Sequence, residues 1–65
     1  MRNYVFRIAS EMGYQAEYSG DGTSAMSAFE DLVEHVGIYL PLEEVIQVMA
    51  ISETGLIVRF EVKKC

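Results

Sequence analysis

The feature that most constrains this chain is a four-residue pattern that occurs twice, as SEMG at residues 10–13 and as SETG at residues 52–55. Each copy lies between two runs of alternating apolar and polar residues. Each predicts a type I turn whose fourth residue is a glycine at positive φ, which closes a hairpin with a three-residue loop and a glycine bulge. The sequence therefore predicts two β-hairpins, with Gly13 and Gly55 in the left-handed region.

The turns also predict which residues lie opposite each other, because hairpin register follows from the turn. In the second hairpin one face is then apolar throughout, with the pairs Ser52 with Leu56, Ala50 with Val58, Val48 with Phe60 and Ile46 with Val62. The other face is mixed, with the pairs Ile51 with Ile57, Met49 with Arg59, Gln47 with Glu61 and Val45 with Lys63. In the first hairpin the same counting predicts Ser10 with Tyr14, Ile8 with Ala16, Phe6 with Tyr18 and, on the reverse side, Arg7 with Glu17. The two hairpins have the same phase.

Between the hairpins, residues 23–36 have the period of an amphipathic helix. At about 100° per residue, one arc of roughly 120° holds the apolar side chains Ala25, Met26, Phe29, Leu32, Val33 and Val36. The expected N-cap is Thr23 or Ser24, after a flexible Gly-Asp-Gly at residues 20–22, and Gly37 is the expected terminator. The opposite side is polar and acidic, with Ser27, Glu30, Asp31, Glu34 and His35.

Residues 38–42 are predicted to connect the helix to the second hairpin, because Pro41 argues against further helix. An alternative makes Pro41 the first position of a second short helix through Glu43, Glu44 and Ile46. We expect Tyr39, Leu40 and Leu42 to close the edge of the core, the alternative being a projecting hydrophobic anchor. The predicted fold is a single α+β domain over residues 1–65, a two-layer ββαββ arrangement with one helix on one side of an antiparallel sheet. We favour the strand order 2-1-3-4.

Charge and composition exclude several functions. The net charge is −5, and the chain has only 5 Lys and Arg residues, so direct nucleic-acid binding is not expected. The single cysteine, Cys65, gives no intramolecular disulfide, and no Cys/His spacing indicates zinc. The apolar stretch near the N-terminus is short and alternating, unlike a signal peptide or a membrane span, so we expect a cytoplasmic protein.

No residue pattern predicts catalysis or a cofactor. His35, the only histidine, has helical neighbours Asp31 and Glu34 but no nucleophile, so we interpret it as a solvated residue near the helix end. The glycine-rich stretch at residues 20–24 lacks the lysine and the spacing of a phosphate-binding loop, and Asp21 alone is too few ligands for calcium. We therefore expect no catalytic residue, no cofactor, no metal and no enzymatic activity.

Two surfaces remain as candidates for binding. The first is an acidic helix face, Glu30, Asp31 and Glu34, extended along the connector by Glu43 and Glu44. It is either a solvated surface or a patch that docks on a basic groove of a protein partner such as a nucleic-acid-handling enzyme. The second is the sheet surface with Val45, Met49, Ile51 and Ile57, and with Val5, which we expect to form a partner or homodimer interface.

The order of elements resembles that of small bacteriophage-encoded proteins that inhibit bacterial RNA polymerase. The resemblance is one of pattern and covers residues 4–9, 14–19, 23–36 and 45–51, whereas the strand expected at residues 56–63 has no counterpart. It implies a non-enzymatic protein-binding module that inhibits a host or defence protein, and it assigns no residue. The alternative is a structural homo-oligomer that uses its outer sheet face and has no inhibitory activity.

Overall fold

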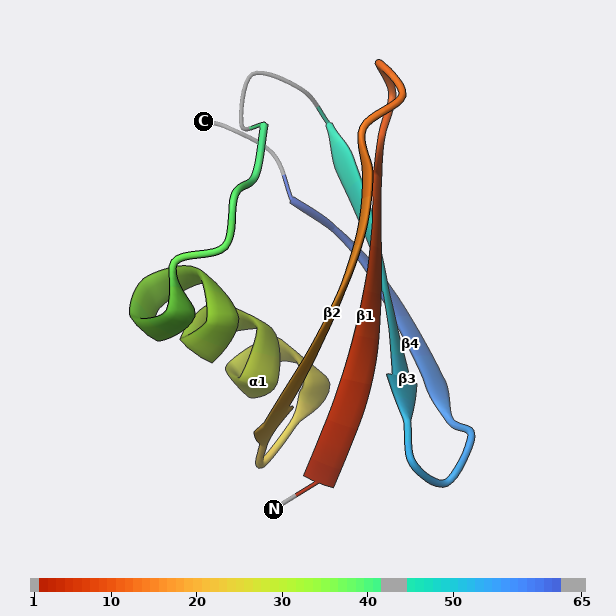
Figure 1. Ribbon diagram of the computed structural model, residues 1–65. Coiled ribbons are helices and arrows are strands. Elements are labelled where there is room, and N and C mark those ends of the chain that lie inside the picture. The colour runs from red at the N-terminus through yellow and green to blue at the C-terminus, as the bar shows by residue number, and fades with distance from the viewer. Residues whose placement is uncertain (1, 42–44, 63–65) are drawn as a thin grey trace.

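Two β-hairpins and the helical segment between them build an α+β fold, which the computed structural model describes for residues 2–41 and 45–62 (Figure 1). The elements are, in chain order, β1 (Arg2–Ser10), β2 (Gln15–Gly22), α1 (Ala25–Asp31), η1 (Leu32–Val36), β3 (Ile46–Ser52) and β4 (Ile57–Val62). The strands form one 4-stranded antiparallel sheet in the order β2-β1-β3-β4, and the helical segment lies on one side of it. The predicted ββαββ arrangement and strand order are confirmed.

Both glycine turns have the predicted conformation. Gly13 has φ 99° and Gly55 has φ 90°. Their amides donate to the carbonyl oxygens of Ser10 and Ser52, at 3.2 and 3.0 Å. The two serine hydroxyls add a contact that the sequence did not predict, since each Oγ accepts from the amide four residues later at 3.0 Å. The turns are thus closed by the serine as well as by the glycine.

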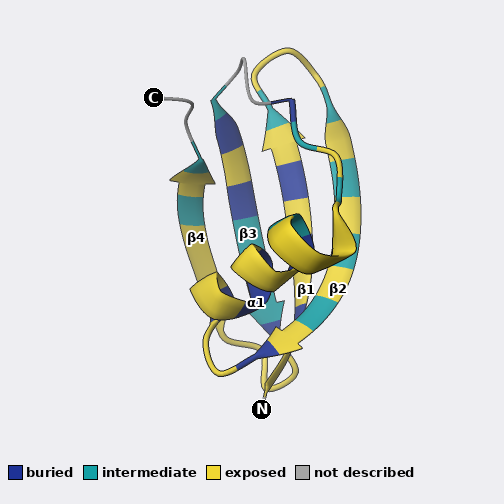
Figure 2. Cartoon of the chain, turned by 90° about the vertical axis from the view of Figure 1, so that its left-hand side faces the viewer, coloured by how far each residue is buried: buried dark blue, intermediate teal, exposed yellow. Residues whose placement is uncertain are grey.

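The register follows from these turns as predicted. In the first hairpin Phe6 lies opposite Tyr18 and Arg7 opposite Glu17. In the second, every predicted pair from Ile51 with Ile57 to Ile46 with Val62 is observed, while Lys63, the predicted partner of Val45, lies outside the described residues. Even-numbered strand residues consequently share the side covered by the helix, here called the inner face, and odd-numbered ones share the outer face. Figure 2 shows the alternation as bands of buried and exposed residues.

The helix begins and ends where its sequence predicts. Ser24 is the N-cap, and its Oγ accepts from the amide of Ser27 at 3.1 Å. Gly37 ends the segment at φ 79°. The last 5 residues wind as a wider π-helical turn, in which the amide of Gly37 donates to the carbonyl of Leu32 at 2.9 Å. Sequence periodicity did not predict this wider turn.

The Gly-Asp-Gly expected as a flexible loop is instead the end of β2, where Gly20 pairs with Tyr4 and Gly22 with Arg2. Both glycines lie on the inner face, under the helix. A Cβ at Gly22 would lie 2.8 Å from the amide nitrogen of Ala28, and a Cβ at Gly20 would lie 3.1 Å from Cγ of Leu32. The missing side chains therefore let the helix backbone approach β2.

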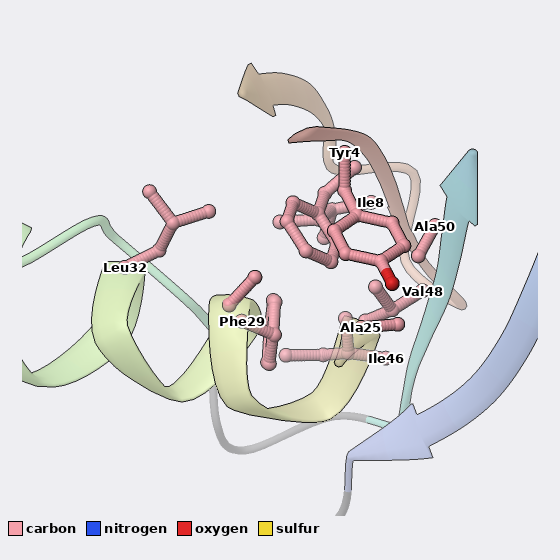
Figure 3. Packing of buried hydrophobic residues seen from close by; sticks show 10 residues of the cluster. Tyr4, Ile8, Ala25, Phe29, Leu32, Ile46, Val48 and Ala50 are labelled. Atoms are coloured by element: carbon pink, nitrogen blue, oxygen red, sulfur yellow. The ribbon is translucent and has the colours of Figure 1, made fainter. Parts of the chain in front are cut away.

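The core lies between the inner face and the helix (Figure 3). Phe29 is central, because the centroid of its ring lies 5.6 Å from that of Phe6 and 5.3 Å from that of Phe60. The buried apolar side chains are Tyr4, Phe6, Ile8, Ala25, Ala28, Phe29, Leu32, Ile46, Val48 and Ala50. The aromatic residues of the inner face thus belong to the core, as predicted.

The apolar arc of the helix is partly different from its prediction. Met26 and Val36 are 48% and 65% exposed, whereas Ala28, which the arc omitted, is fully buried. The end of the helical segment lies farther from the sheet than its start (Figure 1), which leaves Val36 without cover. Ala28 is buried because it lies directly against Gly22.

The connector is not helical at Pro41, and Ile46 begins β3, which contradicts both ends of the alternative second helix. Leu40 packs against the core, as expected. Tyr39 is 62% exposed and therefore does not close the core. Its ring meets that of Tyr14 edge-on, with ring centroids 5.4 Å apart. Leu42, Glu43 and Glu44 lie outside the described residues.

Candidate binding surfaces

An apolar row crosses three strands on the outer face of the sheet. Val5 of β1 lies opposite Ile51 of β3, which lies opposite Ile57 of β4. Val5 is 39% exposed and Ile57 53% exposed, while Ile51 between them is half-buried. These three residues, here called the outer row, were predicted as part of an interface, and the register brings them together. No described element covers them, because the helix occupies the opposite face.

A second row runs beside the outer row and is charged at both ends. Met49 lies between Arg7 and Arg59, and Arg7 is followed on β2 by Glu17. Arg7 Nε and Glu17 Oε2 form an exposed ion pair at 3.1 Å. An open groove of about 730 Å³ passes over this row, and Ala9, Gln15 and Gln47 also line it. The sequence paired these residues correctly but did not predict the groove, whose lining comes from all four strands.

The acidic helix face is exposed, as predicted. Glu30, Asp31 and Glu34 are all exposed. Asp31 is engaged locally, because its Oδ1 lies 3.1 Å from Nδ1 of His35 one turn later, and both side chains are more than half exposed. The extension of this face through Glu43 and Glu44 lies outside the described residues, and Val45 beside them is half-buried.

The inner face of β4 departs from the expected apolar core. Leu56, next to this strand, is 64% exposed and Val58 is 45% exposed, while Phe60 and Val62 are half-buried. A helix about 10 Å wide covers about two strands at a spacing of ~4.8 Å, so a four-stranded sheet extends beyond it. The closest backbone approach of the helix is to β2, at the opposite edge. Apolar side chains of β4 are therefore uncovered on both faces of the sheet.

Three tyrosines meet where the connector crosses β2. The hydroxyl of Tyr14 lies 3.4 Å from that of Tyr18 and donates to the carbonyl of Tyr39, also at 3.4 Å. The hydrogen bond to Tyr18, followed by partial burial, raises the pKa of the Tyr14 phenol above its ordinary value. These contacts tie the connector to the first hairpin.

Within residues 2–41 and 45–62, no group of three or more His, Cys, Asp or Glu side chains is arranged to bind a metal ion. None of the helices described here has the length and apolar character needed to cross a membrane. The chain matches no family model, no curated protein and no solved structure.

Proposed function

We propose that this chain is a non-enzymatic protein-binding domain and that the outer row is the centre of its contact surface. The observation that carries the proposal is the register that places Val5, Ile51 and Ile57 side by side on the uncovered face. Contiguous exposed apolar side chains on a soluble domain are typical of interaction sites. The adjacent groove around Met49 gives a partner side chain a place to insert.

The binding free energy that the outer row can contribute follows from the apolar surface that a partner would bury. Complete burial of one Val or Ile is worth roughly 1.5–3 kcal/mol, and the outer row already has about half of its surface out of water in the free chain. A partner that covers it gains about 1 kcal/mol per side chain. Replacing Ile51 by glutamate removes that gain and places a charge under the partner, so we expect at least a tenfold weaker complex.

The acidic helix face is the alternative contact surface for a protein-binding function. It lies on the opposite side of the molecule from the outer row, and its carboxylates can attract a basic groove over a distance set by the salt concentration. An inhibitor that blocks a nucleic-acid-handling enzyme in this way would bind faster at low salt. The triple variant Glu30→Gln, Asp31→Asn and Glu34→Gln should then slow association and flatten its salt dependence.

One experiment distinguishes the outer row from the acidic helix face as the contact surface. The parent chain is used to capture binding proteins from a bacterial lysate, and the affinity of each identified target is then measured for the variants. Ile51→Glu should abolish or strongly weaken capture. The matched control is Met12→Glu, which also replaces an apolar side chain by glutamate, in a turn residue that is 78% exposed. Equal binding by Ile51→Glu and the parent chain would rule out the outer row. An activity assay on the target then tests for inhibition.

The alternative, a homo-oligomer that uses the outer face, is tested with the same variants. Ile51→Glu or Ile57→Glu should dissociate such an assembly. A parent protein that sediments only as a monomer at micromolar concentration would dispose of this alternative.

A further inference from the structure

The free edge of β4 carries an unusual set of side chains for an exposed strand. The strand pairs only with β3 among the described residues. The three consecutive residues Leu56, Ile57 and Val58 are each between 45% and 64% exposed. The other edge strand, β2, instead has Gly20 and Gly22 under the helix and acidic residues on its outer face, which are features that discourage edge pairing.

The backbone of β4 is also ready to pair. The amide of Ser52 donates to the carbonyl of Leu56 at 2.8 Å, so these two residues direct backbone groups toward each other as the hydrogen-bonded pairs of a ladder do. In an antiparallel ladder such pairs alternate with non-bonded ones, so Ile57, Arg59 and Glu61 direct their N–H and C=O groups away from β3. An edge with unpaired donors and apolar neighbours is a template for another strand.

We propose that β4 pairs antiparallel with β4 of a second copy of this chain, with Phe60 on the two-fold axis. In that register Arg59 lies opposite Glu61 of the second copy, and Glu61 lies opposite its Arg59. Moving the axis to Arg59 would oppose two arginines, and moving it to Glu61 would oppose two glutamates. Among the described residues of β4, only the register centred on Phe60 brings opposite charges face to face, and we choose it for that reason.

The same register gives Val58 an apolar neighbour and pairs the outward backbone groups of Arg59 and Glu61. On the inner face Phe60 meets its own copy, and Val58 meets Val62 of the second copy, which covers the exposed part of Val58. Arg59 and Glu61 both direct their backbone groups outward, so they form the hydrogen-bonded pair. Arg59 has no ion pair among the described residues, whereas Glu61 accepts from Nε2 of Gln47 at 2.7 Å through one oxygen only. The dimer is a single eight-stranded sheet with both helices on one face.

The test is sedimentation of the purified protein over a range of concentrations, with charge reversals at the proposed pair. The parent chain should reach twice its mass of 7.3 kDa. Arg59→Glu and Glu61→Arg, each alone, place like charges opposite each other at two positions and should raise the dimer dissociation constant about tenfold or more. An equimolar mixture of the two single variants should restore a dimer, because every facing pair is then opposite in charge. Glu30→Arg, which changes net charge as Glu61→Arg does but on the helix, should dimerise as the parent does.

Amide hydrogen exchange gives a second measurement, because protection that comes from folding alone does not depend on protein concentration. The amides of Arg59 and Glu61 should gain protection as protein concentration rises, while those of β2 should not. A parent chain that stays monomeric at every concentration, a dimer indifferent to both reversals, or a mixture that fails to recover would overturn the proposal. Protection of β4 amides only when a different protein is added would assign the edge to that partner's strand instead.

This proposal stands independently of the outer row. It is measured on the purified chain without a target, and Ile51→Glu, which lies on β3, should leave the β4 dimer intact. If Ile51→Glu lost the dimer and Arg59→Glu kept it, the dimer interface would be the outer face, and the proposed pairing of the β4 edges would be wrong.

Discussion

Gly22→Ala tests how closely the helix backbone packs on β2. An alanine Cβ at this position would lie 2.8 Å from the amide nitrogen and 3.0 Å from Cα of Ala28. Both atoms belong to the helix backbone, so the helix must move as a unit to relieve the contact. Overpacking of this kind costs about 1–3 kcal/mol, and the loss of chain entropy in the unfolded state offsets roughly 0.4–1 kcal/mol.

We therefore expect Gly22→Ala to lower the free energy of unfolding by about 1.5 kcal/mol, which for a domain of this size lowers Tm by about 10 °C. Urea unfolding followed by circular dichroism gives the free energy of unfolding, and thermal unfolding followed by the same signal gives Tm. Gly20→Ala is the matched control, because its Cβ would meet the flexible side chain of Leu32 at 3.1 Å and not the backbone. It should cost clearly less. Equal stability of Gly22→Ala and the parent chain, or a larger loss at Gly20, would refute this account of the packing.

Two further predictions concern the core and the tyrosine cluster. Phe29→Ala should lower the free energy of unfolding by about 3 kcal/mol or more, because this residue is 4% exposed. Val36→Ala, at a residue that is 65% exposed, should change it by less than about 1 kcal/mol. Similar urea midpoints for the two variants would contradict the assignment of Phe29 to the core and of Val36 to the surface. Tyr18→Phe should bring the raised pKa of Tyr14 down toward its ordinary value, which ultraviolet titration of the phenolate measures. Because the pKa of Tyr14 is higher in the folded chain, this group stabilises the fold at pH values below the ordinary tyrosine pKa of about 10. The contribution should disappear as the pH rises through the pKa of the folded chain. An unchanged Tyr14 titration in Tyr18→Phe would show that the hydroxyl contact is not the cause.

The strand register was predictable because two independent signals agree at each hairpin. Gly13 and Gly55 determine the turns, and the alternation of apolar residues determines the faces. The strand order followed from the handedness expected for the connection through the helix. The turns, the register and the strand order were therefore predicted correctly, whereas the π-helical turn at Leu32–Val36 and the strand ending at Gly22 were not.

The errors arise where one element decides what another can cover. Alternation placed Leu56 and Val58 on the face that the helix covers, but the helix contacts β4 at Phe60, through Phe29, and leaves Leu56 and Val58 exposed. The exposure of Val36 depends on the angle between helix and sheet, which periodicity does not encode. The inner-face glycines of β2 were a usable signal, since alternate glycines on a strand indicate a close approach.

Of the candidate surfaces, those that depend on strand register were predicted from the sequence, and those that depend on what the helix covers were not. The outer row needs only the register, and its members were named from the sequence. The free β4 edge follows from the predicted strand order, but the exposure of Leu56 and Val58 beside it depends on how far the helix covers the sheet.

The most direct test of the proposed function is a nuclear magnetic resonance titration of the isotope-labelled chain with a captured target protein. The largest chemical-shift changes should map to Val5, Met49 and Ile51 on the outer face, while the amides of the acidic helix face should change little. Changes confined to Glu30, Asp31 and Glu34, with the outer row unaffected, would contradict the proposed contact surface.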